Sequence, residues 1–293
     1  MVSSQNLDMH KPTSINPLTS EMGTAPSLQQ HRRHGMWNGL RDACPLAWRF
    51  FLRDFRAKYR HSILGVLWAA IVPLFLIAML LVLHRSGIVQ LHGLNNVPYV
   101  VFIVIGVTIW GLFATTLTAC TDSLINAGEL ISKIQFPRVS LLLAQAGMGL
   151  VEFAIRIPLV VAIMLYENQF AGFLHLGLGI LAMTPLFLFA IATGLVTSVV
   201  ATLFRDLGFV LPIALGVLML LSPILYPIPH DSLLGKLNTF NPITHIVETS
   251  RNILLGSLSA PPGYWFVTLG ILVFLLVAWR FFFVAQRRLA ERI

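Results

Sequence analysis

Long apolar runs alternate with short polar segments along most of the chain. Six runs occupy residues 63–83, 98–120, 140–165, 178–204, 207–226 and 264–284. Each contains about 20 residues or more, and an α-helix of that length crosses a hydrocarbon layer of about 30 Å. The pattern predicts an all-α polytopic membrane protein with six transmembrane helices.

The basic residues indicate how these helices are oriented. Of the 20 Lys and Arg residues, sixteen lie before the first run, in the connections after the second and fourth runs, or at the end of the sixth. The opposite side holds Arg85, Lys236 and Arg251, and Arg156 lies inside the third run. Because short cytoplasmic loops of membrane proteins are rich in Lys and Arg, both termini are predicted to be cytoplasmic. Residues 63–293 would form the transmembrane domain.

The segment before the first run has the pattern of an amphipathic helix. Residues 45–62 carry an apolar stripe beside a stripe of arginines, formed by Trp48, Phe51, Leu52, Phe55 and Tyr59 and by Arg49, Arg53, Arg56 and Arg60. Such a helix suits the membrane interface, and Pro45 fits its first turn. It acts either as an orientation anchor or, through Arg56 and Arg60, as a collector of an anionic lipid-linked substrate. Residues 1–44 are rich in Ser, Thr, Pro, Gln and His, which predicts a disordered cytoplasmic leader.

A second amphipathic segment follows the second run, at residues 121–138. One helical face is formed by Leu124, Ala127, Ile131 and Ile134, and the other faces carry Asp122, Glu129 and Lys133. Pro137 ends this helix, because a proline disfavours the helical conformation at the residue before it. A cytoplasmic helix of this kind lies either on lipid or in a groove of a soluble partner.

Composition excludes several classes of function. Hydrophobic residues make up 56% of the chain and charged residues 11%, with mean hydropathy +0.79. The cytoplasmic bias of the basic residues explains most of the net charge of +8, so nucleic-acid binding is not expected. Cys44 and Cys120 fall at cytoplasmic positions, where disulfides are rare. The sequence has no zinc-hydrolase motif and no Gly-x-x-x-x-Gly-Lys-[Ser/Thr] loop, so we expect neither a catalytic or metal site nor an ATP site.

The third run contains an unusual pair of charges. Glu152 and Arg156 are four residues apart, so they share one helical face and can pair. An ionised side chain at mid-membrane costs about 2.5 to 3.5 kcal/mol on insertion scales, which favours pairing. The pair either holds helices together, or one of its members lines a conduit.

Five motifs in sequence order carry a family resemblance. They are Arg-Ala-Lys-Tyr-Arg-His-Ser at 56–62 leading into Leu-Gly-Val-Leu-Trp-Ala at 64–69 and Pro73, Lys-Ile-Gln-Phe-Pro-Arg at 133–138, Phe-Arg-Asp-Leu at 204–207, Ser-Pro-Ile-Leu-Tyr-Pro at 222–227, and Asn-Pro-Ile-Thr-His at 241–245. In this order the chain resembles the membrane subunit of an ABC-2 type exporter, specifically the O-antigen and capsular polysaccharide permeases.

The resemblance implies a homodimer of permeases in the bacterial inner membrane, bound to two copies of a separate subunit that holds ATP and Mg. This chain would then be no enzyme but the conduit for a lipid-linked surface polysaccharide. The helix around residues 129–136 would be the coupling helix received by the ATPase, and the turn at residues 205–206 a smaller second contact. The predicted coupling residues are Glu129, Ile131, Lys133, Phe136, Arg138, Arg205 and Asp206.

A polysaccharide conduit also suggests lining residues. Aromatic rings can stack on the apolar faces of sugars, although aromatics in membrane helices are more often belt or core residues. The candidate lining residues are Trp68, Phe75, Phe102, Trp110, Glu152 and Arg156.

The segment 227–263 has a helix signal of its own. Asn241 can cap it, Pro242 suits its first turn, and Ile243, Ile246, Val247 and Leu254 share one face. By the resemblance, short outer helices here would form an outer gate, with Tyr226, His245, Glu248 and Arg251 as candidates. A solvated polar face is the alternative for the last three. Pro223, Pro227 and Pro229 break the preceding helix and can form a hinge.

Two alternatives stay open. An ABC-2 exporter of a drug or small lipid shares this topology, although the arginine-rich helix followed by residues 64–69 favours the polysaccharide branch. A membrane-embedded lipid-modifying transferase needs polar groups that converge at one membrane face. The histidines do not converge, because His84 and His92 fall on the outer side and His31, His34 and His61 on the cytoplasmic side.

Overall fold

The computed structural model describes residues 36–60, 65–87, 97–128, 136–204, 206–229 and 231–290, with side chains except at 36–42, 65–70, 72 and 287–290. Its helices are α1 (Met36–Tyr59), α2 (Gly65–Arg85), α3 (Tyr99–Asn126), α5 (Val139–Tyr166), α6 (Phe173–Ala182), α7 (Thr184–Leu203), α8 (Leu207–Leu221), α9 (Leu233–Asn238), α10 (Pro242–Leu254) and α11 (Pro262–Ala290). The described residues contain no strand, which confirms the all-α prediction.

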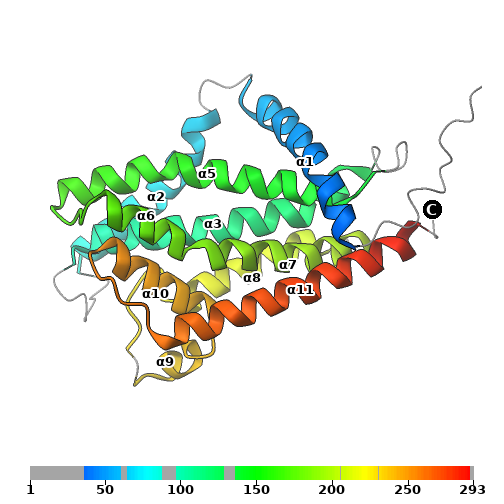
Figure 1. Cartoon of the computed structure of the whole chain (residues 1–293). Helices are drawn as coiled ribbons and strands as arrows, with labels where there is room; N and C mark the ends of the chain where they lie inside the picture. Colours follow the sequence, from blue (N-terminus) through cyan, green and yellow to red (C-terminus); the bar gives the residue numbers. More distant parts are fainter. Residues whose placement is uncertain are drawn as a thin grey trace, which may run out of the picture.

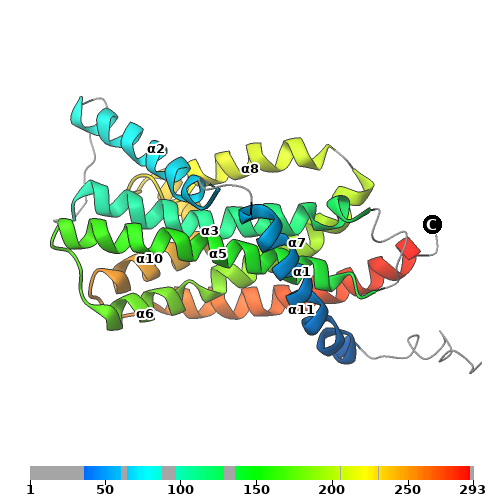
Figure 2. The ribbon, with the colours of Figure 1, turned by 90° about the horizontal axis from the view of Figure 1, so that it is seen from above.

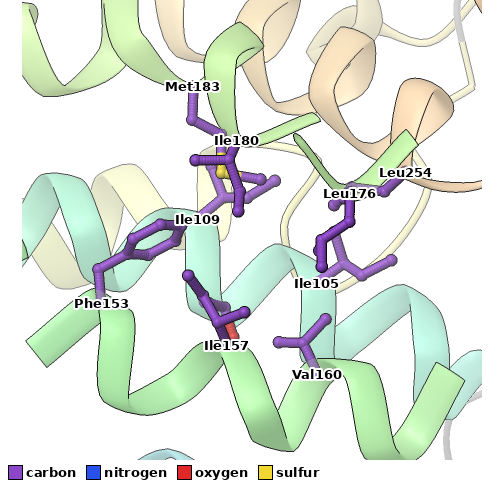
Figure 3. Close-up of a pocket in the computed structure, with 10 residues that line it drawn as sticks. Ile105, Ile109, Phe153, Ile157, Val160, Leu176, Ile180, Met183 and Leu254 are labelled. Atoms are coloured by element: carbon purple, nitrogen blue, oxygen red, sulfur yellow. The ribbon is translucent and has the colours of Figure 1, made fainter. Parts of the chain in front are cut away.

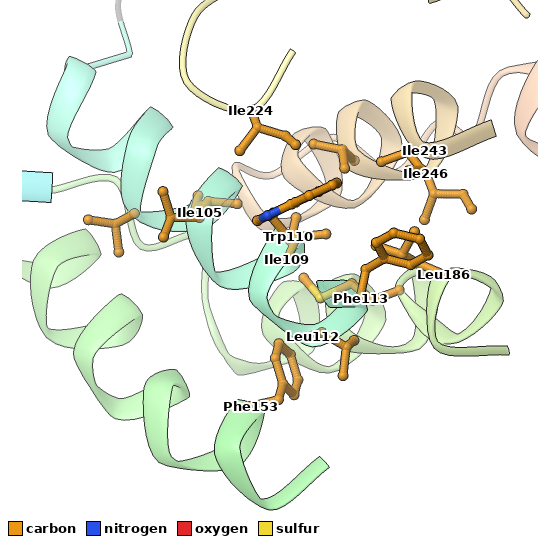
Figure 4. Close-up of a cluster of buried hydrophobic side chains, with 14 of the residues drawn as sticks. Ile105, Ile109, Trp110, Leu112, Phe113, Phe153, Leu186, Ile224, Ile243 and Ile246 are labelled. Carbon is orange, nitrogen blue, oxygen red and sulfur yellow. The ribbon is translucent and has the colours of Figure 1, made fainter. Parts of the chain in front are cut away.

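The bundle is built around α3. Helices α3, α5, α7 and α11 lie side by side as long rods, with α9 and α10 at the end opposite the C-terminal end of α11 (Figure 1). Every residue from 101 to 113 of α3 is buried, because α3 packs against α2, α5, α7, α8 and α10. A helix that is apolar all round belongs at such a centre. Trp110 and Phe113 of α3 lie in the resulting core among isoleucines of α10 and of the segment after α8 (Figure 4).

Four of the described helical stretches are long and apolar enough to cross a membrane. They are Tyr99–Asn126, Val139–Tyr166, Phe173–Leu203 and Pro262–Gln286, and they correspond to the predicted runs 98–120, 140–165, 178–204 and 264–284. The stretch Phe173–Leu203 contains both α6 and α7, and Pro185 lies in the first turn of α7. The remaining two runs are shorter apolar helices in the described structure, Pro73–Arg85 within α2 and Leu207–Leu221.

The run 207–226 is helical only to Leu221, and it breaks before Pro223 as the prolines predict. Helix α8 has 15 residues, about 22 Å at 1.5 Å per residue, which is short of a hydrocarbon layer of about 30 Å. It ends because Ser222 precedes Pro223 and takes an extended conformation, with φ −102° and ψ 155°. We call residues 222–226 the outer break. Figure 2 shows α2 and α8 along the edge of the bundle opposite α11.

Two other boundaries differ from the sequence prediction. Helix α1 starts at Met36 and carries Pro45 in its interior, so residues 36–44 are helical rather than part of a disordered leader. An interior proline removes one backbone hydrogen bond, and a helix can absorb that loss where it also packs on a neighbour. Helix α3 continues to Asn126, so Leu124 is buried at the end of α3 instead of starting a separate helix.

Candidate functional site

Helix α1 lies along the first half of α5, and its contacts recur at helical spacing. A methyl group on Gly147 of α5 would lie 3.0 Å from the Phe51 ring, so the absent side chain makes room for that ring. One turn further along α1, Asp54 Oδ2 accepts a hydrogen bond of 2.8 Å from Gln145 Nε2. Phe51 and Asp54 therefore fix the face that α1 presents to α5.

A charge cluster continues this interface at the middle of α5. Lys58 Nζ lies 2.6 Å from Glu152 Oε1, and Arg156 Nη2 lies 3.5 Å from Glu152 Oε2. The pairing of Glu152 with Arg156 that the four-residue spacing predicts is confirmed. Sequence reasoning missed Lys58, which brings α1 into the cluster. Gly111 of α3 completes it, because a Cβ there would collide with Arg156 Nη1.

Tyr59 borders the same cluster. Its hydroxyl is buried and has no hydrogen-bond partner among the described residues. Burial raises the pKa of the Tyr59 phenol above its ordinary value, so it stays protonated at neutral pH. The side chains of the neighbouring Arg56 and Arg60, at the C-terminal end of α1, are exposed. They are free to meet an anionic headgroup, and that role remains a prediction.

A polar cavity of about 300 Å³ opens beside α1. It is lined by Arg53, Asp54, Ser123, Asn126, Ala127, Leu141 and Gln145, from α1, the end of α3 and the start of α5. Arg53 Nε also pairs with Asp54 Oδ1 at 2.8 Å, and its guanidinium lies 5.0 Å from the centre of the Phe50 ring. Ala127 and Leu141, which line the cavity, precede and follow the predicted coupling segment in the sequence.

That coupling segment is described only in part. Glu129, Ile131, Lys133 and Arg205 lie outside the described residues. Phe136 packs edge-on against Phe50 of α1, with ring centres 5.4 Å apart. Arg138 precedes α5, and partial burial lowers the pKa of its guanidinium. Asp206, at the start of α8, is exposed. The contact between Phe136 and Phe50 therefore ties the end of the predicted coupling helix to α1.

The candidate lining aromatics occupy different environments. Phe75 of α2 is 76% exposed, whereas Phe102 and Trp110 of α3 are buried in the core of the protomer. The side chain of Trp68 lies outside the described part of the chain. Among the aromatics of this set whose side chains are described, Phe75 is therefore the exposed one.

An apolar cavity between α3, α5, α6 and α10 measures about 20 Å³ (Figure 3). Its walls are formed by residues such as Ile105, Ile157, Ile180 and Leu254, with Thr108 as the polar exception. A space this small and this apolar gives a water molecule few hydrogen-bond partners. It is a gap in the packing rather than a path for a substrate.

Side chains of α3, α9 and α10 donate hydrogen bonds to backbone carbonyl groups at the end of α8 and in the outer break. Asn238 Nδ2 donates to the Leu221 carbonyl at 2.7 Å, Arg251 Nη2 to the Pro223 carbonyl at 2.9 Å, and the Tyr99 hydroxyl to the Leu225 carbonyl at 3.1 Å. The Tyr226 hydroxyl donates to the Leu220 carbonyl. Non-helical backbone is stable away from water only when such partners satisfy it, so the outer break is a defined structure.

Helix α10 forms as the sequence predicts. The Asn241 side chain accepts a hydrogen bond from the Ile243 backbone at 3.0 Å, and Pro242 occupies the first turn. The polar residues of α10 are less exposed than a solvated face requires. His245 Nε2 lies 2.9 Å from the Thr239 carbonyl, and Arg251 is 5% exposed. Glu248 is half-buried. A gate role for these residues remains a prediction.

The family model of the ABC-2 type transporter matches residues 46–255. This interval begins in α1, contains the charge cluster and the outer break, and ends just after α10.

Three relatives match at low identity over most of their length. The O-antigen export system permease protein RfbA of Klebsiella pneumoniae is 24% identical over 241 residues, which cover 78% of this chain and 90% of the relative. RfbA of Myxococcus xanthus is 24% identical over 204 residues, covering 69% and 76%. The polysialic acid transport protein KpsM of Escherichia coli is 26% identical over 220 residues, covering 73% and 80%. Since the family model covers more than half of the chain, this protein belongs to the ABC-2 type transporter family.

Proposed function

We propose that this protein is the membrane-spanning permease subunit of an ATP-driven exporter of lipid-linked surface polysaccharide, of the O-antigen or capsule type, in the bacterial inner membrane. The observation that carries the proposal is the agreement among relatives. Proteins of three organisms, named for O-antigen export or polysialic acid transport, align over 69 to 78% of this chain at 24 to 26% identity.

The proposed topology has six crossings with both termini in the cytoplasm. The distribution of Lys and Arg supports it, as do the four long apolar stretches of the described structure. Helix α2 and the combination of α8 with the outer break would supply the other two crossings. The outer break would lie at the outer end of its crossing, where protein rather than lipid surrounds it.

Energy would come from a separate ATP-binding subunit that carries the ATP and Mg. The coupling segment around residues 129–136 would dock in that subunit, with residues 205–206 as a smaller contact. The packing of Phe136 on Phe50 supports a mechanical route from this segment into α1. From α1 the route would continue through Lys58 to Glu152 in the middle of α5.

A second copy of this chain would complete the conduit. Exposed apolar side chains cover α8 on several sides, including Phe209, Ile213 and Val217, and continue onto α2 at Phe75 and Val82. Both helices lie along one edge of the bundle (Figure 2). A homodimer that packs along this edge would place Phe75 of both copies near the shared path.

The test is ATP hydrolysis by the complex of this chain with its ATP-binding subunit in lipid nanodiscs. We expect lipid-linked glycan to stimulate hydrolysis several-fold, whereas the same lipid without glycan leaves the rate unchanged. Equal stimulation by glycan-free lipid or by a small apolar drug would favour the alternative ABC-2 exporter. No stimulation by any lipid-linked glycan from the source organism would contradict the proposed substrate class.

A further inference from the structure

One side chain joins three elements at the outer break. Arg251 belongs to α10, its guanidinium carbon lies 3.7 Å from the centre of the Phe102 ring of α3, and its Nη2 donates to the Pro223 carbonyl at 2.9 Å. A guanidinium stacked on an aromatic face and bonded to a carbonyl is held more firmly than by either contact alone. Arg251 therefore ties α10, α3 and the outer break together.

The surface of α3 on which Arg251 and the outer break pack requires a glycine at position 106. A Cβ at Gly106 would collide with the Ile224 carbonyl oxygen and would lie 2.8 Å from Arg251 Nη2. Gly106 lies one turn after Phe102, so both contribute to the same face of α3. The outer break therefore rests on α3 at the side of the helix where no side chain intervenes.

The arrangement holds a buried cation that is only partly satisfied. Arg251 Nε has no hydrogen-bond partner among the described residues. Burial lowers the pKa of Arg251 to about 10, so the side chain stays charged at neutral pH. A buried charge with an open donor is costly. Hydration of the guanidinium would offset part of the cost of the lost contacts if the break moved away from α3.

We propose that Arg251 is the positioning residue that holds the outer break closed against the surface of α3 formed by Phe102 and Gly106. The inference rests on the proposed function, in which the outer break forms the outer end of the conduit. Separation of Arg251 from the Pro223 carbonyl then opens that end. The role differs from direct contact with a polymer, because Arg251 acts through the backbone that it holds.

Accessibility of the break provides the test. Ile224 is fully buried, so a cysteine at this position reports whether the break has left α3. The full chain in nanodiscs carries Ile224→Cys and Cys44→Ser, while Cys120 is retained because it is buried. A water-soluble maleimide has access to both faces of a nanodisc. Ser257→Cys, at an exposed position, measures the rate for an open site.

We expect Arg251→Gln to accelerate labelling of the cysteine introduced by Ile224→Cys about tenfold, because loss of one charge-assisted hydrogen bond shifts a two-state equilibrium by that order. Arg251→Lys keeps the charge and is expected to label at an intermediate rate. Gly106→Ala keeps the Arg251 side chain but places a methyl group against both the Ile224 carbonyl and Arg251 Nη2, and it is expected to match Arg251→Gln. Gly270→Ala on α11 adds a methyl group in open space and is expected to label like the parent.

Parent-like labelling in Arg251→Gln would overturn the proposal, whatever the rate in Gly106→Ala. So would equal acceleration in Gly270→Ala, because it would reflect general loosening. If Arg251→Gln does not yield folded protein, Arg251→Lys decides: labelling faster than in the parent supports the proposal, and parent-like labelling overturns it. The assay uses neither glycan nor ATP. Failure of glycan to stimulate hydrolysis therefore tests the proposed function separately from this role of Arg251.

Discussion

At the scale of single residues, Gly111 is the most constrained neighbour of the charge cluster. Gly111→Ala would drive a methyl group into Arg156 and separate it from Glu152. Overpacking of this kind costs about 1 to 3 kcal/mol. We expect a lower thermal unfolding temperature in detergent and reduced export. Gly177→Ala in α6, with open space around it, is the matched control and should be neutral or slightly stabilising. Equal unfolding temperatures of the two variants would contradict the geometry of the cluster.

The charge cluster itself predicts unequal effects of its members. Glu152→Gln weakens the acceptor for both Lys58 and Arg156, whereas Lys58→Gln removes one half-exposed partner. We expect Glu152→Gln to destabilise the protein by about 1 to 3 kcal/mol and Lys58→Gln by less than about 1 kcal/mol. Chemical unfolding of the purified permease measures both. A larger loss of stability in Lys58→Gln than in Glu152→Gln would show that the contact between α1 and α5 contributes more than the pair within α5.

Residue spacing predicted some of these contacts and missed others for a physical reason. The pairing of Glu152 with Arg156 follows from spacing within one helix. The contact with Lys58 joins positions 94 residues apart and depends on how α1 leans on α5, which no local pattern encodes. A solvated polar face was one alternative for Arg251, yet the side chain packs on Phe102 and the outer break and is buried.

At the scale of elements, α10 depends on a cap that the sequence reveals. Asn241→Ala removes the hydrogen bond to the Ile243 backbone and the one to Ser222 Oγ. We expect a loss of about 0.5 to 2 kcal/mol. Asn252→Ala changes an exposed asparagine of the same helix and should stay within about 0.5 kcal/mol of the parent. Thermal unfolding of the two variants separates the cap from a general effect of losing an asparagine.

Helix α1 and the coupling segment form a second testable element. Phe50→Ala removes the ring that supports Phe136. We expect less ATP-binding subunit to co-purify, because the docking segment loses its support. Trp48→Ala, which truncates a largely exposed ring of the same helix, is the control. Charge reversal at Glu129 and Lys133 should also reduce co-purification. Full assembly and export in the Phe50 and charge-reversed variants would rule out this docking segment.

Element boundaries were predictable where their signals are local. Asn241 with Pro242 placed the start of α10 correctly, since a cap and a first-turn proline act within a few residues. Hydropathy alone extended the fifth run through the outer break, because apolar composition does not reveal backbone conformation. The prolines after Leu221 carried the correct signal. By contrast, Pro45 was expected in the first turn of its helix but lies in the interior of α1.

At the scale of the whole molecule, the end that contains Phe136 lies opposite the end that contains α9 and α10 (Figure 1). Phe136 and the polar cavity lie at the end of the bundle where the coupling segment meets α1, whereas α9 and α10 lie at the other end (Figure 1). Helix α3 spans both and is buried along most of its length. In the proposed mechanism, a displacement at the coupling end would therefore reach the outer break through α3.

The most direct measurement of the central claim is transport by proteoliposomes that contain the complex with its ATP-binding subunits facing outward. Lipid-linked glycan starts in the outer leaflet, and a glycosidase added outside reports what remains accessible. We predict that ATP makes a growing fraction of the glycan resistant to the enzyme, and that a hydrolysis-deficient ATP-binding subunit abolishes this protection. Glycan that stays fully accessible while the assembled complex hydrolyses ATP would contradict the account.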